Sequence, residues 1–271
     1  MARFLFWNVN GRSLDSLIVP IVRDHRIHVV ILIEPPSIDT LETSLSAVGP
    51  FRRVPSRDRF RVYSRFRGNV FVPLTPHLTD DRSDFLQLRY PGMEDVILAI
   101  THGPDRRNYS QNYRAMFFAR LALNIAGIEE GLAHRRTLVI GDMNASPFES
   151  ELEGVLGLHA IQLDSLARGT SRVVLGDPHL FFLNPMWTCY SQSPPATYYW
   201  NNSGPHEHFW YMLDQVVFRP ALRSRFRLPS LRIVSQSGSR SLLTTGGFPD
   251  TVNASDHLPV RFELTLQRAS S

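Results

Sequence analysis

Residues 137–144 read TLVIGDMN, and the interpretation of the whole chain starts from this stretch. Its apolar part, residues 137–142, has the length and the Val and Ile content of a β-strand. Asp142 and Asn144 stand at the strand's end, where polar side chains add little stability unless they meet others at a common site. The stretch therefore predicts a buried strand that delivers a carboxylate and an amide to one place.

Further apolar runs along the chain have the same character. They predict strands over residues 2–9, 28–34, 59–66, 95–101, 213–218 and 258–266. Polar residues again stand at strand ends: Asn8 in FWNVNG, Glu34 in ILIEPP, and Asp256 with His257 in ASDHLP. Taken singly, each segment is equally typical of a turn or a helix cap. Taken together, they predict one site assembled from distant segments.

Helical periodicity appears between two of the predicted strands. Apolar residues recur there at spacings of three and four: Tyr113, Phe117, Leu121, Ile125 and Ile128. This spacing predicts a helix over about 110–130 with these residues on one face. A second helix start is predicted at Ser146, with Pro147 at the first helical position and Glu149 closing a capping box. Strands and helices mixed in this way predict an α/β (α+β) fold.

The domain organisation follows from length and composition. The 271 residues contain no internal repeat and no linker long enough to separate two domains, so a single domain over 1–271 is expected. Within it, residues 176–211 are dense in aromatics and broken by prolines, which predicts an irregular excursion. Its aromatic side chains are candidates for stacking on bases or for packing: Trp187, Tyr190, Tyr198, Tyr199, Trp200, Trp210 and Tyr211.

Composition excludes several classes of protein. With 43% hydrophobic and 20% charged residues the chain is neither disordered nor collagen-like, and a lone Cys189 excludes an intramolecular disulfide. No Cys/His cluster has zinc-like spacing, and no apolar run is long enough to span a membrane. The N-terminal apolar stretch is too short for a signal peptide, and two N-glycosylation acceptors, Asn144 and Asn253, lie at the predicted site. We therefore expect a cytoplasmic protein without membrane insertion.

All 29 basic side chains are arginine, and the formal net charge is +4. Arginine presents a planar fork of donors that suits phosphate, so this composition is compatible with a polyphosphate partner. GC-rich codon usage accounts for the same absence of lysine, and the composition does not choose between the two.

The candidate site has the chemistry of a divalent-metal centre. Glu34, Asp142 and Asp256 are carboxylates at the ends of apolar strands, and hard oxygen ligands of this kind suit Mg²⁺ or Mn²⁺. His257 adds a group that titrates near neutral pH and can act on a phosphate or an attacking water. A metal together with a histidine is the equipment for hydrolysing phosphoesters.

The order of these motifs resembles that of the endonuclease/exonuclease/phosphatase superfamily, the group typified by pancreatic deoxyribonuclease. The sequence GDMN (141–144) and the sequence SDH (255–257) are the most specific motifs, and they stand about 110 residues apart in the family's order. The resemblance spans residues 4–263. It implies a four-layer sandwich of two mixed β-sheets packed face to face, with helices outside.

The resemblance also implies a role for each metal-site residue. Glu34 would be the principal metal ligand, helped by Asn8. Asp256 would lie near the Mg²⁺ or Mn²⁺ ion and would fix the histidine that follows it.

The implied catalytic residues come from four segments. Asp142 would orient or deprotonate the attacking water, and Asn144 would hold the scissile phosphate. His257 would hydrogen-bond a phosphate oxygen and stabilise its developing charge. His102, in AITHGP, matches the histidine that many hydrolytic members place near the leaving group, and Asp214, in YMLDQVVF, matches an aspartate that supports the site in abasic-site endonucleases and phosphodiesterases.

Two arginine clusters are candidates for substrate binding. On a strand, Arg59, Arg61, Arg65 and Arg67 would project from one face as a basic stripe, and Phe60, Val62 and Phe66 from the other. The stripe would follow a phosphate backbone, or it would guard an edge strand against pairing. A second cluster, Arg106, Arg107 and Arg114, follows His102 and is expected to reach the same substrate.

These features together predict a Mg²⁺-dependent phosphodiesterase that acts on DNA or RNA. Two alternatives within the same superfamily stay open, a phosphatase and a phospholipid or small-molecule phosphodiesterase. A catalytically silent nucleic-acid-binding module is a third, which is disfavoured because all the metal and histidine residues are present. The sequence does not predict the oligomeric state.

Overall fold

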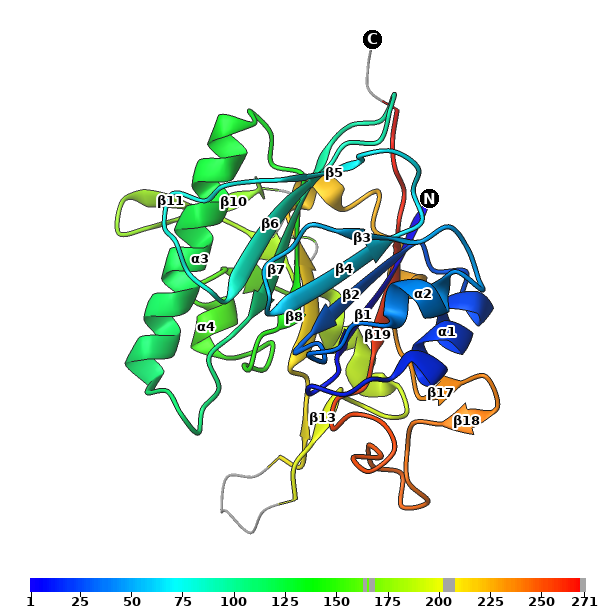
Figure 1. Cartoon of the computed structure of the whole chain (residues 1–271). Coiled ribbons are helices and arrows are strands. Elements are labelled where there is room, and N and C mark those ends of the chain that lie inside the picture. Colours follow the sequence, from blue (N-terminus) through cyan, green and yellow to red (C-terminus); the bar gives the residue numbers. More distant parts are fainter. Residues whose placement is uncertain (163–164, 166–168, 202–207, 269–271) are drawn as a thin grey trace. The chain divides into compact units, whose positions relative to one another are not determined.

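The computed structural model describes residues 1–162, 165, 169–201 and 208–268, and it confirms an α/β fold with two large mixed sheets (Figure 1). The chain forms two compact units, each built around one of these sheets. The first unit comprises Met1–Val70, Cys189–Asp214 and Arg227–Leu266, and the second comprises Phe71–Thr188, Gln215–Phe226 and Gln267–Ser271. A single domain over the whole chain stays a prediction.

The first unit contains a six-stranded sheet in the order β16-β19-β1-β2-β4-β3. Its strands are β1 (Ala2–Asn8), β2 (Val29–Ile33), β3 (Arg52–Val54), β4 (Phe60–Ser64), β16 (Arg232–Ile233) and β19 (Val260–Leu264). β1 runs parallel to β2 and antiparallel to β19, where the rings of Phe4 and Phe262 stack with centroids 4.9 Å apart. Two short helices, α1 (Asp15–Asp24) and α2 (Leu41–Leu45), belong to the same unit.

The second unit contains a seven-stranded sheet in the order β5-β6-β7-β8-β15-β12-β9. Its strands are β5 (Phe71–Pro73), β6 (Ser83–Leu88), β7 (Val96–His102), β8 (Thr137–Asp142), β9 (Ala160–Ile161), β12 (Phe182–Leu183) and β15 (Asp214–Phe218), and the first residue of β15, Asp214, belongs to the first unit. β7 and β8 are parallel and fully buried, as continuous Val, Ile and Leu runs predict. The predicted strands are thus all present, with ends shifted by one or two residues.

The long predicted helix is also confirmed, as α3 (Gln111–Gly131). Ser110 caps it, because its hydroxyl oxygen accepts the backbone N–H of Tyr113. Phe117, Leu121 and Ile125 are buried against side chains of β6, β7 and β8, and Figure 1 shows the helix lying along this sheet. Tyr113, predicted on the same face, is exposed, and its ring stacks on that of Tyr109.

The second predicted helix start is wrong by several residues. The short helix α4 begins at Ser150 and ends at Glu153, and residues 146–149 form a turn closed by a hydrogen bond from the Glu149 N–H to the Ser146 carbonyl. The Glu149 carboxylate does accept the Ser146 N–H at 2.5 Å, as a capping box requires. It also pairs with Arg114 and Arg106, so tertiary ion pairs hold this segment as a turn.

The aromatic stretch 176–211 is more regular than predicted. Its described part contains β11 (Asp177–Leu180), which pairs with β10 (Ser171–Val174), and also β12, a 3-10 helix η2 (Pro185–Ser191), β13 (Tyr198–Tyr199) and β14 (Trp210–Tyr211). Residues 202–207 lie outside the described residues. Of the seven aromatic candidates, Trp187, Tyr190 and Trp200 are exposed and the other four are half-buried.

Short elements complete the first and second units. They are the 3-10 helices η3 (Pro220–Leu222) and η4 (Leu228–Ser230) and the strands β17 (Gln236–Ser237) and β18 (Arg240–Ser241). Among the helices that the structure describes, none has both the length and the apolar character needed to cross a bilayer.

A buried ion pair ties α3 to the sheet of the second unit. The Arg219 guanidinium donates to both carboxylate oxygens of Glu129, at 2.9 and 3.1 Å, and to the Phe181 carbonyl at 3.1 Å. Thr137 donates its hydroxyl to the same carboxylate, and the guanidinium lies 3.9 Å from the centroid of the Phe182 ring. Both charges are almost fully buried, so each depends on the other for compensation.

Replacement of this arginine is expected to destabilise the protein strongly. Arg219→Met leaves the Glu129 carboxylate buried without its partner, which costs about 3–5 kcal/mol of unfolding free energy. Urea denaturation of the variant measures this loss, with Arg223→Met, at an exposed position, as the control. A loss no larger than that of the control would contradict the role assigned to the pair.

The first unit holds a histidine in its neutral form. The backbone N–H of Arg3 donates to His28 Nδ1 at 3.0 Å, and the imidazole stacks on the Phe66 ring with centroids 5.6 Å apart. Burial, followed by the charges of Arg3 and Arg65, lowers the pKa of His28 to about 4. The acceptor role of Nδ1 likewise requires the ring to be unprotonated there.

This histidine makes stability depend on pH. The pKa in the folded chain lies below the value of about 6.5 in the unfolded chain, so the unfolded chain binds more protons between pH 6.5 and 4 and stability falls as the pH is lowered through this window. Because the ring is half exposed, solvent screening reduces the loss to about 1–2 kcal/mol. Denaturation curves across this window should show a shallower pH dependence for His28→Asn than for the wild type or His208→Asn. Equal slopes in all three would contradict the assignment.

Candidate active site

The first unit brings Asn8 and Glu34 together at one edge of its sheet. Asn8 is the last residue of β1 and Glu34 directly follows β2, and because the two strands are parallel their carboxyl ends lie side by side. Asn8 Nδ2 donates to Glu34 Oε1 at 3.3 Å, while Asn8 Oδ1 accepts the Asn10 N–H at 3.0 Å. The predicted pair of strand-end groups is therefore in contact, with the asparagine orienting the carboxylate.

The backbone at Glu34 is strained. Its φ of +48° is uncommon for a residue with a long side chain. Hydrogen bonds hold it on both sides, from the Glu34 N–H to the Arg59 carbonyl and from the Gly11 N–H to the Glu34 carbonyl. Strain of this kind costs roughly 1–3 kcal/mol and clusters at functional sites, where it aims a side chain in a direction that regular structure does not allow.

Residues 255–257 lie beside this pair within the same unit. Asp256 Oδ1 accepts a hydrogen bond from Asn10 Nδ2 at 3.1 Å, which connects it to the loop after β1. The Ser255 hydroxyl donates to the Asn8 carbonyl at 2.7 Å and accepts the His257 N–H at 3.2 Å. Ser255 therefore sets the position of His257 relative to Asn8. The sequence does not predict this role, because serine is common in turns whether or not it holds a neighbouring residue.

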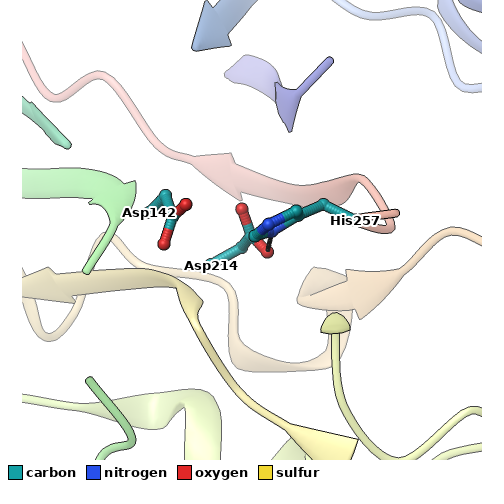
Figure 2. A group of neighbouring side chains, drawn as sticks. All are labelled: Asp142, Asp214 and His257. Atoms are coloured by element: carbon teal, nitrogen blue, oxygen red, sulfur yellow. Dashed lines mark hydrogen bonds and ion pairs between the residues drawn. The ribbon is translucent and has the colours of Figure 1, made fainter. Parts of the chain in front are cut away.

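His257 is held by Asp214. Figure 2 shows the imidazole against the carboxylate, with His257 Nδ1 and Asp214 Oδ2 2.7 Å apart, and the two residues are 7% and 0% exposed. Thr197 accepts the Asp214 N–H at 3.1 Å, and Trp7 donates its indole N–H to the His257 carbonyl at 2.8 Å. A carboxylate on Nδ1 fixes the ring orientation and favours the tautomer that carries its proton there.

This geometry corrects one implied role. The resemblance implies that Asp256 fixes the histidine beside it, but the carboxylate that bonds to the ring is Asp214, 43 residues away. Adjacent residues cannot easily make this bond, since the backbone directs their side chains apart. Tyr198, a candidate for stacking or packing, lies against the ring with centroids 4.8 Å apart.

The second unit brings His102, Asp142 and Asn144 together. His102 ends β7 and is paired with Asp142 at the end of the parallel strand β8, with His102 Nε2 and Asp142 Oδ2 3.8 Å apart. Asp142, also labelled in Figure 2, accepts the Asn144 N–H at 2.9 Å. Asn144 Nδ2 donates to the Gly103 carbonyl at 3.0 Å, so the turn after β8 is fastened to the end of β7.

Gly103 is required for this close approach. Its N–H donates to the Asp142 carbonyl at 2.7 Å, and a Cβ atom added to it would lie 2.2 Å from the Met143 carbonyl oxygen. Any other residue would push the two strand ends apart. The glycine is visible in AITHGP, but its role is not predictable there, because a glycine alone does not say which backbone approaches it.

One member of the second arginine cluster, Arg114, cannot contact substrate at the surface as predicted. Arg114 is only 5% exposed, and its guanidinium contacts the carboxylates of Glu149 and Glu151 and donates to the Asn144 carbonyl at 3.1 Å. It therefore positions the turn that carries Asn144 and is not a surface contact for substrate. Arg106 pairs with Glu149, and Arg107 is exposed.

The predicted basic stripe does not form one face of a strand. β4 ends at Ser64, so Arg65 and Arg67 lie beyond the strand, and β4 is not an edge strand because it lies between β2 and β3. Arg61 is half-buried, lies 3.8 Å from the Asp39 carboxylate and donates to the Phe60 carbonyl. Arg59 lies beside Glu34 through its backbone carbonyl, which places it at the candidate site.

Ser255 supplies a test of how this site is held. Ser255→Ala removes the hydrogen bond to the Asn8 carbonyl and the acceptor of the His257 N–H, so we expect a loss of about 1–3 kcal/mol in unfolding free energy. Urea denaturation measures it, with the exposed Ser241→Ala as the matched control. Equal stabilities of the two variants would show that Ser255 does not hold the site.

Comparison with known proteins agrees with this architecture. The sequence model described as "Endonuclease/Exonuclease/phosphatase family" matches residues 5–257. A search of curated protein sequences found no significant match. Among solved structures, an AP endonuclease from Archaeoglobus fulgidus is 13% identical with a TM-score of 0.59, over 98% of this chain and 100% of that chain.

Two further structures are similar at the level of the fold. The 3′ phosphatase NExo from Neisseria, bound to product DNA hairpin, is 14% identical with a TM-score of 0.57, over 98% of this chain and 100% of that chain. TDP2 of D. rerio, complexed with single strand DNA product, is 16% identical with a TM-score of 0.56, over 97% and 98% of the two chains. Since the family match covers nearly the whole chain, this protein belongs to the endonuclease/exonuclease/phosphatase family.

Proposed function

We propose that the chain is a Mg²⁺- or Mn²⁺-dependent phosphodiesterase that hydrolyses phosphodiester bonds in DNA or RNA. Members of its family are hydrolases that act on phosphoester bonds. The observation that carries the proposal is the buried hydrogen bond between Asp214 and His257, in the same unit as the acidic and amide groups of Asn8, Glu34 and Asp256. A histidine oriented in this way near carboxylates can transfer a proton and stabilise the charge that develops when a phosphoester is hydrolysed.

The donor set fits a hard divalent cation. Glu34, Asn8 and Asp256 offer carboxylate and amide oxygens, the ligands that Mg²⁺ and Mn²⁺ prefer. Glu34 would be the principal ligand, since Asn8 orients its carboxylate and the strained backbone aims it. When bound, the ion neutralises charge on the scissile phosphate and acidifies water.

His257 acts on the phosphate in this proposal. Asp214 holds the proton on Nδ1, which leaves Nε2 as the nitrogen that can hydrogen-bond a non-bridging phosphate oxygen. The carboxylate also stabilises the positive charge on the ring when Nε2 carries a proton. His257 thereby counters the negative charge that develops on the phosphate as water attacks.

The family match also supports roles for three residues of the second unit. Asp142 orients or deprotonates the attacking water, and Asn144 holds the scissile phosphate through its side-chain amide. His102 acts near the leaving group. These assignments are supported by the family match, which runs over both units, and by the hydrogen bonds that fix Asp142 and Asn144 at one strand end.

Nucleic acid is the substrate class that the comparisons favour. The Neisseria phosphatase and the D. rerio TDP2 structures both contain DNA products, and both have the fold of this chain. Arg59 at the Glu34 end of the sheet, together with Arg106 and Arg107 after His102, is a candidate contact for the phosphate backbone.

The cytoplasm is the compartment that we propose for this activity. The two N-glycosylation acceptors at the predicted site use their amide nitrogens in hydrogen bonds, Asn144 to the Gly103 carbonyl at 3.0 Å and Asn253 to Asp250 Oδ2 at 2.9 Å. Attachment of a glycan to either nitrogen would disrupt these contacts, and at Asn144 it would also obstruct a proposed catalytic residue.

The decisive experiment combines substrates, metal and one conservative substitution. Labelled single- and double-stranded DNA and RNA, and small phosphate esters, are incubated with the chain in Mg²⁺ or in chelator. We expect that nucleic acid is hydrolysed only when the ion is present. The rate should fall by about 10²–10⁴-fold in Asp214→Asn, because an uncharged amide does not stabilise the positive charge on the His257 ring. Asp177→Asn, at an exposed position of β11, is the matched control.

Two outcomes would overturn parts of the proposal. Hydrolysis of small phosphate esters alone would replace the nuclease assignment by a phosphatase or a small-molecule phosphodiesterase. Unchanged turnover in Asp214→Asn, with activity in the wild type, would remove His257 from the catalytic residues.

A further inference from the structure

A group of arginines shares one face of the first unit's sheet, between the middle of β1 and the end opposite to Asn8. In the antiparallel ladders, Arg232 of β16 is directly opposite Arg261 of β19, and Arg3 of β1 is directly opposite Glu263 of β19. Directly opposite residues project from the same face, and so do residues two apart on one strand. Arg3, Arg232, Arg261 and Glu263 therefore lie on one face, where Figure 1 shows β1 beside β19.

A single carboxylate lies within this group. Glu263 pairs with Arg3 at 3.0 Å and with Arg227 at 3.3 Å. Within the described ranges, Arg232 and Arg261 form no ion pair, and their guanidinium groups donate to the backbone carbonyls of Leu231 and Ser230. We call Arg3, Arg227, Arg232 and Arg261 the basic face, which carries four positive charges against one negative charge.

Repulsion between the positive charges of the basic face destabilises the sheet unless an external anion binds there. Like charges directly opposite each other on neighbouring strands destabilise a sheet, and Arg232 and Arg261 occupy such positions. Two neighbouring groups have lowered pKa values for a related reason. Burial, followed by the charge of Arg232, lowers the pKa of Arg261. Burial, followed by the charge of Arg261, lowers the pKa of His25. A positive potential therefore persists over this part of the sheet.

We propose that the basic face is a second binding site for the phosphates of a nucleic-acid strand, away from the candidate catalytic residues. This inference rests on the proposed function for the choice of nucleic acid over another polyanion. Guanidinium groups present the planar forks that match phosphate oxygens. Arg3, Arg261 and Arg232 stand on three adjacent strands, across about 10 Å of sheet, a length that about three phosphates of a nucleic-acid strand occupy.

The distance from the catalytic residues sets a length requirement. Arg261 is opposite Leu5, which is three residues or about 10 Å from Asn8 along β1, and Arg3 is five residues or about 16 Å from Asn8. A strand must therefore extend about three nucleotides beyond the scissile phosphate to reach Arg261 and about five to reach Arg3. The site would therefore retain long substrates and would have no effect on very short ones.

Equilibrium binding tests this without relying on hydrolysis. A fluorescent single-stranded 20-nucleotide DNA is titrated with the full chain carrying Asp142→Asn, in chelator, over a series of salt concentrations. Adding Arg232→Gln and Arg261→Gln should raise Kd about tenfold and should reduce the slope of log K against log salt by about 1.4, because two phosphate contacts are lost. The lysine pair Arg232→Lys and Arg261→Lys should keep most of the slope, since it keeps the charges.

The control removes two charges elsewhere. Arg172→Gln with Arg240→Gln changes the net charge equally at exposed positions outside the basic face, and it should leave Kd and slope close to those of the parent. Equal effects of the two glutamine pairs would overturn the inference. So would loss of binding to vesicles of phosphatidylcholine and phosphatidylserine with unchanged DNA binding, which would assign the basic face to a membrane surface.

The failure of this inference and the failure of the proposed function are distinguishable. A chain that binds the DNA through the basic face but hydrolyses no nucleic acid would retain the inference and refute the nuclease assignment. A chain that hydrolyses nucleic acid while the glutamine pair binds like the control would do the opposite.

Discussion

Parallel pairing of strands is the constraint that assembles each of the two groups of candidate catalytic residues within its own unit. β1 pairs in parallel with β2, and β7 pairs in parallel with β8, so in each unit two carboxyl ends lie at the same edge of a sheet. Asn8 meets Glu34 and His102 meets Asp142 for this reason alone, although 26 and 40 residues separate them in the chain. The strands themselves are almost entirely buried, and their burial supplies the stability that allows polar and strained residues at their ends.

Local strain marks the same positions. Glu34 and Asn144 both have φ values of +48°, and both follow a buried strand. At Asn144 the cost is small because asparagine tolerates this conformation, whereas at Glu34 the neighbouring segments hold the backbone through two hydrogen bonds. Gly103 is a second case in which the backbone conformation at a strand end determines the residue, since the absence of a side chain lets two strand ends approach. The sheets thus fix the backbone, and the backbone aims the reactive groups.

The arginines illustrate how one residue type takes several physical roles. Arg219 is buried and compensates Glu129, and Arg114 is buried and fixes the turn that carries Asn144. Arg232 and Arg261 instead share a sheet face with few acidic neighbours. Composition alone presents these side chains as one population suited to phosphate, because burial and ion pairing are properties of the tertiary structure and do not show in a count.

Local sequence was enough to predict the strands, the long helix and the polar groups at the strand ends. These features depend on interactions within a few residues: apolar periodicity, the Ser110 cap, and strand ends that place Asp142 and Glu34 after buried runs. The family could be recognised at the same level, because its motifs are short and local. The choice of partners, in contrast, depended on the folded chain. His257 bonds to Asp214 and not to the adjacent Asp256, and Glu149 turns toward arginines from distant segments where a capping box would have begun a helix. The reason is that a hydrogen bond or ion pair depends on distance and direction in space, and residues far apart in the chain gain these only when the sheets and loops bring their backbones together.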